Sequence, residues 1–564
     1  MKEIDRSRDV SRPPEELHRN ERLKAGSHFL RGSIENGLKD QLTGAFAQDD
    51  TQLTKFHGFY QQDDRDLREE RRRQKLEPAY QMMLRLRLPG GICSPSQWLA
   101  LDQIAHEYAD RSLRLTTRQT FQFHGVLKRN VQPVIRALNS IRLDSRAACG
   151  DVNRTVMAAS NPYESKIHAS VCDLASSLSD HFAPRSNAYG EIWLGAERIA
   201  PEQDAEPIYG PTYLPRKFKI GFAVPPANDI DVFSQDLGFI AIKEGSELAG
   251  FNVCVGGGMG RTDNAPATYP RLADVVGFIH PDQVRAVAEA VLSTQRDFGD
   301  RANRSHARLK YTIDTHGLDW FVREVQARAG LELEPPRAFD FQHNGDRYGW
   351  VQSDDGRWHY TLFVENGRIR DSSEYPLKSI LRQIAESMTG EFRLTPNQNL
   401  VLANVDPDVK DRIDTLLQEL ERPDRQGMLR RNSMACVAFP TCGLAMAESE
   451  RYLPDLVTKL EALALEAGIA DQPIVVRMTG CPNGCARPYL AEIGFTGRAP
   501  GKYNVYLGGG FHGQRLNQLY LENVGEREIL SELRQIFCHY SEQRQPGEPF
   551  GDFVIRAGYL SRLT

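Results

Sequence analysis

An internal repeat limits the folds open to this chain more than any other feature of its sequence. Residues 393–400, RLTPNQNL, match residues 114–121, RLTTRQTF. Residues 503–510, YNVYLGGG, match residues 251–258, FNVCVGGG, with the same internal spacing. A fainter third match, in the same order, pairs Met434-Ala435-Cys436 with Met157-Ala158-Ala159. The repeat predicts two related halves in a pseudo-twofold arrangement, joined near residues 335–345.

Hydrophobic patterning predicts that both helices and strands build these halves. Residues 82–88 alternate apolar and basic side chains, which is typical of a half-buried strand, and this strand stops at Pro89-Gly90-Gly91. A helix is expected from Ser96 or Gln97 to about Tyr108. Residues 474–478 form another predicted strand, which delivers Cys481 at its carboxyl end. Ligands of α/β folds bind beyond such strand ends, so Cys481 is a candidate functional residue.

Two cysteine pairs in the second half form the most specific chemical motif. Cys436 and Cys442 make a C-x5-C pair and Cys481 and Cys485 a C-x3-C pair, with 38 residues between the pairs. Four thiolates suit zinc, copper(I) or an iron–sulfur cluster, and this spacing, wider than that of most zinc sites, favours a cluster. Two disulfides, or four unrelated core cysteines, remain as alternatives. Because the first half lacks these cysteines, we expect one such centre per chain.

Composition narrows the function classes without selecting one. With 40% hydrophobic residues, 26% charged residues and a net charge of −5, the chain is typical of a globular protein without bulk affinity for nucleic acid or anionic membranes. No apolar stretch approaches roughly 20 residues, and the first residues lack the apolar core of a signal peptide. Nine cysteines, an odd number, do not fit a secreted disulfide framework, so we expect a reducing, cytoplasmic setting. The remaining five are expected to be core or incidental thiols: Cys93, Cys149, Cys172, Cys254 and Cys538.

Together, the cysteine pairs, the RLT repeats and the paired Gly-Gly-Gly turns resemble those of the siroheme-dependent sulfite and nitrite reductases. The resemblance extends from about Lys55 to the C-terminus, and its finer detail rests on residues 55–60 (KFHGFY), 161–165 (NPYES) and 214–219 (LPRKFK). It implies an α+β (mixed α/β) fold of two pseudo-twofold related halves, each a ferredoxin-like half-module with a larger α/β sheet domain, around a central siroheme and 4Fe-4S site. The expected divisions are an N-terminal arm available for partner docking over 1–70, half-modules over 71–140 and 336–425, and α/β domains over 141–335 and 426–564.

The resemblance also implies cofactors and their ligands. Cys436, Cys442, Cys481 and Cys485 would hold a 4Fe-4S cluster, and the sulfur of Cys485 would join it to the siroheme iron. Asn483 lies in the turn between the last two cysteines, where amides can hydrogen-bond cluster sulfur. Siroheme carries eight carboxylates, which are costly to bury without partners, so Arg and Lys side chains must converge on it. The candidate cofactor contacts are Arg87, Arg114, Arg118, Gln122, His124, Arg216, Asn483 and Cys485, with a purely structural role for His124 equally open.

The activity implied by the resemblance is the six-electron reduction of sulfite to sulfide for cysteine biosynthesis. Arg85, Arg154, Lys217 and Lys219 are expected to line the pocket that binds the anion and delivers protons. Strand alternation places Arg85 and Arg87 on one face, and likewise Lys217 and Lys219. Neither Gly-Gly-Gly turn fits the G-x-G-x-x-G pattern, so NADPH, FAD and FMN are expected only on a separate diflavin reductase subunit, in a hetero-oligomer.

Two other functions remain open from the sequence. Ferredoxin-dependent sulfite reductases and nitrite reductases have the same cofactors but another donor or substrate. A zinc-stapled nucleic-acid-binding protein would also use four cysteines, with basic residues spread over an exposed face beside stacking aromatics. Cysteines in only one of two related halves favour the reductase.

Overall fold

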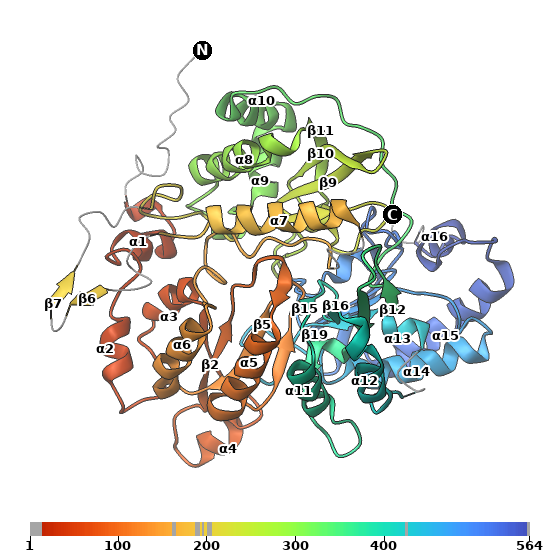
Figure 1. Ribbon diagram of the computed structural model, residues 1–564, viewed down its shortest axis with the longest axis horizontal. Helices are drawn as coiled ribbons and strands as arrows, with labels where there is room; N and C mark the ends of the chain where they lie inside the picture. Colours follow the sequence, from red (N-terminus) through yellow and green to blue (C-terminus); the bar gives the residue numbers. More distant parts are fainter. Residues whose placement is uncertain are drawn as a thin grey trace.

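The computed structural model describes residues 14–160, 165–185, 206–422 and 427–560, together with the backbone of two short strands, β6 (Ile192–Leu194) and β7 (Glu197–Ile199). Residues 1–13 of the expected arm and residues 161–164 of the family match lie outside the described residues. Figure 1 shows four larger sheets with helices packed around them. None of the described helices combines the length and the apolar character needed to cross a membrane.

Two five-stranded antiparallel sheets, one in each half, exchange an edge strand. The first has the order β1-β2-β5-β4-β14 and the second the order β12-β13-β16-β15-β3. β14 comes from the second half but completes the first sheet, and β3 does the reverse. Each half-module is therefore complete only in the presence of the other. The strands are β1 (Phe59–Asp63), β2 (Tyr80–Arg85), β3 (Ile92–Cys93), β4 (Leu113–Leu115), β5 (Phe121–Val126), β12 (Gly349–Gln352), β13 (Trp358–Leu362), β14 (Arg368–Ile369), β15 (Glu391–Leu394) and β16 (Leu400–Val405), and the helices are α5 (Pro95–Tyr108), α6 (Val131–Ser140), α11 (Leu377–Ser387) and α12 (Pro407–Gln418).

The core beneath these two sheets is continuous. The indole of Trp98, in α5, stacks on the ring of Phe392, in β15, with ring centroids 4.3 Å apart. The same buried cluster extends from Met82 in β2 to Leu417 in α12. Because one core lies under both sheets, the two half-modules are fixed relative to each other.

Each half continues into a second sheet whose first strands are parallel. β8 pairs in parallel with β9, and β17, β18 and β19 are parallel neighbours. The orders are β11-β10-β9-β8 and β17-β18-β19-β20-β21. Parallel strands end at the same edge, so the loops that follow them gather there. The strands are β8 (Ile220–Ala223), β9 (Leu237–Glu244), β10 (Glu247–Val255), β11 (Asp274–Ile279), β17 (Ser433–Ala435), β18 (Val476–Thr479), β19 (Ile493–Ala499), β20 (Lys502–Leu507) and β21 (Gln518–Val524), accompanied by α7 (Lys166–His181), α8 (Val284–Phe298), α9 (Leu309–His316), α10 (Leu318–Ala329), α13 (Met428–Arg431), α14 (Leu453–Glu466), α15 (Glu526–Gln543) and α16 (Phe550–Arg556).

Equivalent hydrogen bonds make the internal repeat visible. Gln119 and Gln398 hold the same place in the two RLT repeats, and both have a positive φ, 50° and 70°. The side-chain amide of Gln119 donates to the carbonyl of Ala158 at 2.8 Å, and that of Gln398 donates to the carbonyl of Ala435 at 2.9 Å. Ala158 and Ala435 are themselves equivalent in the third match. The predicted mixed α/β fold of two pseudo-twofold related halves is confirmed.

Residues 19–63, which belong to the expected N-terminal arm, form helices and an edge strand that pack against the rest of the chain. β1 is the edge strand of the first sheet and pairs with β2. The helix α1 (Arg19–Ala25) buries Glu21, which forms an ion pair with Arg301 at 2.6 Å. The charges of this segment look solvent-exposed in the sequence because their partners lie far along the chain, 280 positions away in this case. Partner docking by residues 1–70 stays a prediction. The other short helices here are α2 (Ile34–Lys39), α3 (Asp50–Leu53) and α4 (Arg68–Arg73).

Candidate cluster and anion site

The second large sheet brings the two cysteine pairs together. β17 and β18 are parallel neighbours, so Cys436, directly after β17, and Cys481, two residues after β18, emerge at the same edge. The backbone amide of Gly480 donates to the sulfur of Cys436 at 3.4 Å, and the side-chain amide of Asn483 donates to the sulfur of Cys481 at 3.5 Å. Donors of this kind tune the potential of iron–sulfur centres.

The four thiols lie close enough to oppose one another's ionisation. Burial raises the pKa of Cys481 to about 12, and the Cys485 thiol is the next largest cause. Burial, followed by Cys485, also raises the pKa values of Cys436 and Cys442. Four thiolates in this space would repel one another, and bound metal ions remove that repulsion. The structure thus gathers the four cysteines that the sequence selects.

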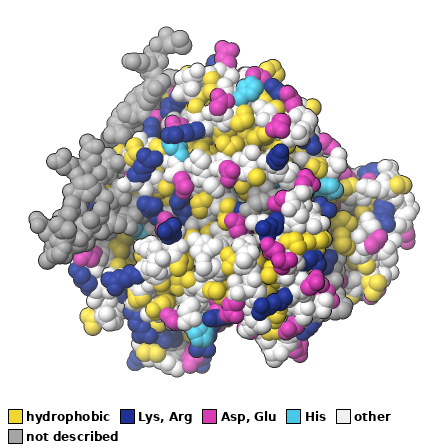
Figure 2. All heavy atoms as spheres, viewed as in Figure 1, with side chains coloured by type: hydrophobic (Ala, Val, Ile, Leu, Met, Phe, Trp, Pro, Cys, Tyr) yellow, Lys and Arg dark blue, Asp and Glu magenta, His cyan; other side chains and the backbone are white. Residues whose placement is uncertain are grey.

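These thiols do not converge on one point. In the described ranges of the chain, no three Cys, His, Asp or Glu side chains are placed to hold a single metal ion. A structural zinc site needs four sulfurs about 2.3 Å from the ion, whereas a cluster of several irons accepts sulfurs that lie further apart. On the face that Figure 2 shows, basic and acidic side chains are interspersed rather than gathered in a basic stripe. Neither finding supports a zinc-stapled nucleic-acid-binding protein.

Residues of the first half hold the loop between Cys481 and Cys485. The hydroxyl of Thr117 donates to the carbonyl of Cys485 at 3.1 Å, and the amide of Arg261 donates to the carbonyl of Pro482 at 3.1 Å. Gly484 has a φ of +64°, and a Cβ there would lie 3.1 Å from the carbonyl oxygen of Met259. Glycine suits this close approach at a positive φ. The cysteine loop is therefore fixed where the two halves meet.

A half-buried group of basic side chains lies near Cys485. Burial, and then Arg308, lower the pKa of Lys217 to about 7, while Cys485 acts in the opposite direction. Burial, and then Lys217, lower the pKa of Lys219 well below its ordinary value. The two lysines therefore lie close to each other, although both precede β8 and neither belongs to a strand. Arg308 is paired with Asp236 through bonds of 2.8 to 3.0 Å, but one carboxylate cannot balance all of these cations. An excess of positive charge of this kind favours a bound anion.

Arg85 and Arg154 join this group through Tyr60. The phenol of Tyr60 interacts with both guanidinium groups, and burial raises its pKa. Arg85 donates to the sulfur of Cys149 at 3.4 Å, and Cys149 is buried, as expected for a core thiol. Arg154 donates to the carbonyls of residues 148 and 150 at 2.9 and 2.7 Å, while its Nε has no partner among the described residues. Arg154 thus supports the local backbone and keeps one donor for a ligand.

A polar row crosses the first half-module. Strand register places Arg85 opposite Gln122, Gln122 opposite Arg114, and Arg114 opposite Arg368. With its amide oxygen turned toward Arg85, Gln122 accepts a hydrogen bond from Nε at 3.0 Å. Cross-strand partners point to the same face of a sheet, so the four side chains form one line. The register of the second sheet places Thr361, Val401, Arg393 and Ile92 at the equivalent positions. The first half-module therefore carries the more polar row, which agrees with one site per chain.

The side chains of Arg114 and Arg87 form ion pairs and hydrogen bonds with other residues of the chain. Arg114 forms an ion pair with Glu450 at 2.7 Å and donates to the carbonyl of Ala435 at 3.0 Å, so it positions the strand before Cys436. Arg87 donates to the carbonyl of Ser179 at 2.6 Å and to Asp180 at 2.9 Å, near the end of α7. These bonds hold Arg87 against the end of α7, and its role as a cofactor contact stays a prediction.

Three other predicted cofactor contacts are Arg118 and Arg216, which are half-buried, and His124, which is buried. Arg118 donates to Gln235 at 3.0 Å, its Nε has no partner in the described ranges, and burial lowers its pKa to about 9. Burial, and then Arg304, lower the pKa of Arg216 to about 10. His124 is 4% exposed, and neither ring nitrogen has a partner in the part of the chain that the structure describes. It lines a pocket of about 640 Å³, so it is not a structural histidine with both nitrogens satisfied.

Sequence reasoning missed four residues of this site: Lys55, Tyr60, Arg308 and Lys310. Burial, and then Arg304, lower the pKa of Lys55 to about 8. Lys310 is fully buried and donates to the carbonyls of residues 258 and 260 at 3.1 and 2.9 Å. Arg308 and Lys310 are two residues apart, like Lys217 and Lys219, and that spacing is the signal that could have found them. Lys55 and Tyr60 belong to the KFHGFY match.

In cofactor-free protein, Lys217→Met is expected to raise the thermal midpoint at pH 6.5. The change removes a repelled, half-buried charge, and such replacements stabilise proteins by about 1–4 kcal/mol. The folded pKa of Lys217 is about 7 against an ordinary 10.5. The charge of Lys217 therefore destabilises the folded state fully below pH 7, and this destabilisation decreases as the pH rises toward 10.5. Thermal unfolding across this range measures the effect, with the exposed Lys243→Met in β9 as control. Equal midpoints for Lys217→Met and wild type at pH 6.5 would contradict the assignment.

Comparison with known proteins identifies the family. Residues 73–141 and 351–420 match the nitrite/sulfite reductase ferredoxin-like half domain, and residues 174–333 match the nitrite and sulphite reductase 4Fe-4S domain. A Methylocella silvestris protein named sulfite reductase (NADPH) hemoprotein beta-component is 58% identical over 99% of this chain and 97% of its own length. A protein of the same name from Staphylococcus haemolyticus is 58% identical over 96% of this chain and 95% of its own. The structure of NirA from Mycobacterium tuberculosis matches with a TM-score of 0.80 at 26% identity, covering 96% of this chain and 97% of that one.

The duplicated fold and the cysteine-containing site define a class of iron–sulfur oxidoreductases. The matches are more specific, and they show that the chain belongs to the nitrite and sulfite reductase family. The resemblance seen in the sequence is confirmed. The 4Fe-4S domain match lies in the first half, and the second half carries the related copy with the four cysteines.

Proposed function

We propose that this chain is the hemoprotein component of an assimilatory, NADPH-dependent sulfite reductase and reduces sulfite to sulfide for cysteine biosynthesis in the cytoplasm. The observation that carries this proposal is that four neighbouring thiols lie beside a group of Arg and Lys side chains whose positive charge exceeds that of the carboxylates paired with them. Full-length similarity to proteins named as that component supports it.

The residues present fit both cofactors of the family. Cys436, Cys442, Cys481 and Cys485 would hold a 4Fe-4S cluster, with the amides of Gly480 and Asn483 directed at sulfur. The carboxylates of siroheme need buried cationic donors, and Arg118 Nε and Arg154 Nε are buried without partners in the described chain. Gln122, His124 and Arg216 are further proposed contacts. When bound, the two cofactors would supply an iron able to bind sulfite and a store of electrons, and Cys485 would be among the residues that hold them.

The chain itself must hold the anion and deliver protons. Reduction of one bisulfite consumes six electrons and seven protons and yields hydrogen sulfide and three waters. The guanidinium groups of Arg85 and Arg154 would bind and stabilise the anion. Lys217 has a pKa of about 7, which suits a proton donor near neutral pH, and Lys219 lies beside it. These four residues are the proposed catalytic groups.

The proposed electron donor is a separate diflavin reductase subunit that carries FAD and FMN and oxidises NADPH. The word "component" in the names of the relatives supports a second subunit, and the sequence shows no dinucleotide-binding motif. The active enzyme would then be a hetero-oligomer. Neither nucleic acid nor a membrane is among the proposed partners.

An absorption spectrum with iron and acid-labile sulfide analysis tests the cofactors. The expected result is a chlorin-like red band with about five irons and four sulfides per chain. A colourless protein with one zinc per chain, from cells that make siroheme, would overturn the proposal.

With reduced methyl viologen as donor, kcat/KM should be higher for sulfite than for nitrite, and the reverse would favour a nitrite reductase. Turnover with NADPH and the diflavin subunit separates this enzyme from a ferredoxin-dependent one.

A further inference from the structure

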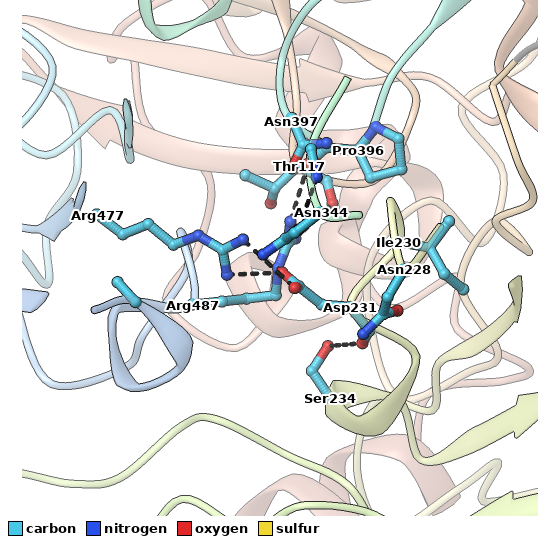
Figure 3. A network of polar contacts seen from close by, with 12 residues as sticks. Thr117, Asn228, Ile230, Asp231, Ser234, Asn344, Pro396, Asn397, Arg477 and Arg487 are labelled. Carbon is cyan, nitrogen blue, oxygen red and sulfur yellow. Dashed lines mark hydrogen bonds and ion pairs between the residues drawn. The ribbon is translucent and has the colours of Figure 1, made fainter. Parts of the chain in front are cut away.

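A buried charge cluster lies where the two halves meet (Figure 3). Asp231, Arg477 and Arg487 are 1%, 2% and 5% exposed. Arg477 donates to the carboxylate of Asp231 at 2.6 Å, and Arg487 donates to the same carboxylate through Nε. Two guanidinium groups thus share one carboxylate, which leaves an excess of positive charge within these three residues. None of the catalytic steps proposed above uses them.

Asp231 and Arg487 hold equivalent positions in the two halves. Asp231 directly precedes the 3-10 helix Val232–Ser234, and Arg487 directly precedes the 3-10 helix Pro488–Leu490. Both residues are left-handed, with φ and ψ of 49° and 59° for Asp231 and of 54° and 50° for Arg487. Each 3-10 helix is followed after two residues by the next strand, β9 or β19. A contact between equivalent residues of a twofold arrangement lies on its axis, so this ion pair marks the pseudo-twofold axis.

Arg487 also bonds both half-modules at equivalent points. It donates through Nη1 to the carbonyl of Thr117 at 3.0 Å and through Nη2 to the carbonyl of Pro396 at 3.0 Å. Thr117 and Pro396 hold the same place in the two RLT repeats. Figure 3 shows both residues beside the two guanidinium groups. One side chain therefore connects Asp231 and the matching turns of both half-modules.

Arg487 is linked to Cys485 both along the backbone and through hydrogen bonds. Arg487 follows Cys485 by two residues, and its amide donates to the carbonyl of Gly484 at 3.0 Å. The hydroxyl of Thr117 donates to the carbonyl of Cys485, while the carbonyl of Thr117 accepts from Arg487. Arg487 lies in the half that contains the four cysteines, and the equivalent residue, Asp231, lies in the half without them. The two halves thus differ in charge at equivalent positions, and the basic member lies two residues from Cys485.

We propose that Asp231 and Arg487 are positioning residues that fix the Cys485 sulfur at the junction of the two halves and set the reduction potential of the centre bound there. This inference rests on the proposed function. The negative charge of the centre grows when it accepts an electron. A nearby positive charge stabilises the reduced form, and a nearby negative charge does the opposite. The two residues therefore have opposite effects on the potential.

Redox titration of the purified holoenzyme, followed by absorption and EPR, tests the proposal. Arg487→Gln is expected to lower the midpoint potential and Asp231→Asn to raise it, each by roughly a tenfold change in the one-electron equilibrium, about 59 mV. Arg487→Lys, which keeps the charge, should stay near wild type. Arg498→Gln removes another ion pair between the halves, that of Arg498 with Asp263, and serves as the matched control. Shifts of the same sign in both variants, or no shift while the cofactors remain bound, would reduce the pair to a structural role.

Hydrogen exchange on the cofactor-free chain tests the positioning separately. Amides of residues 481–487 should exchange roughly tenfold faster in Arg487→Gln than in wild type or Arg498→Gln, because the bonds from the Arg487 side chain to Thr117 and Pro396 are lost. Unchanged exchange in that segment would overturn the proposal. If the wild-type chain held neither siroheme nor a cluster, the proposed function would fail, and the exchange experiment would still decide whether Arg487 holds the loop.

Discussion

Replacing Cys485 with serine is expected to lower sulfite turnover at least about 100-fold, since changing only an outer partner of a metal ligand costs 10–100-fold. A thiolate is a soft ligand suited to iron–sulfur chemistry, and a serine hydroxyl is a poor substitute. The contacts that hold this residue, from the Thr117 hydroxyl and within the loop, involve its backbone and should persist. The change therefore acts through the sulfur. Turnover with reduced methyl viologen, the visible spectrum and the iron content per chain measure the result, and we expect separation of siroheme from the cluster.

Cys538→Ser is the matched control for this experiment. Cys538 is an exposed cysteine of α15 and belongs to neither cysteine pair. It should leave the spectrum and turnover unchanged. Full turnover with unchanged cofactor spectra in Cys485→Ser would show that its sulfur does not join the two cofactors.

Lys217→Ala is expected to lower kcat by about 10²–10⁴-fold, the usual contribution of a positioned proton donor, while both cofactors stay bound. Lys217→Arg should also be slow, because its guanidinium keeps the charge but does not release a proton in this pH range. The measurement is kcat and KM for sulfite per bound siroheme. Loss of siroheme from either variant would make Lys217 a cofactor-binding residue instead.

Lys243→Met is the matched lysine variant. Lys243 is an exposed residue of β9, so its replacement should leave kcat, KM and siroheme content unchanged. The pH profile gives a second readout. Only the protonated lysine donates, so wild-type kcat should fall as the pH rises above the pKa of Lys217, which is about 7 in the chain alone. Bound anions raise that pKa, and the falling limb should therefore lie above pH 7 and be absent from Lys217→Ala.

The turn within each RLT repeat could be predicted from the sequence, whereas the exchange of edge strands between the two halves could not. The RLT repeats form a local turn in which Gln119 and Gln398 make the same side-chain bond, so matching short segments was enough to predict two related halves. The exchange of β3 and β14 was not predictable in this way. Each strand has only two residues, too few for a hydrophobic period, and each pairs with a strand of the other half.

Local patterns were enough to predict the mixed two-halved fold and to select the four cysteines, because a repeat and the spacing of ligands are properties of short segments. Only the tertiary structure decided that Arg87 turns toward α7, since the direction of a side chain just beyond a strand depends on the turn that follows. It also decided that Lys55 and Arg308 join the basic group near Cys485. The pairing of Asp231 with Arg487 joins residues 256 positions apart. No pattern within either segment specifies that contact, because it arises when the two halves close around their common axis.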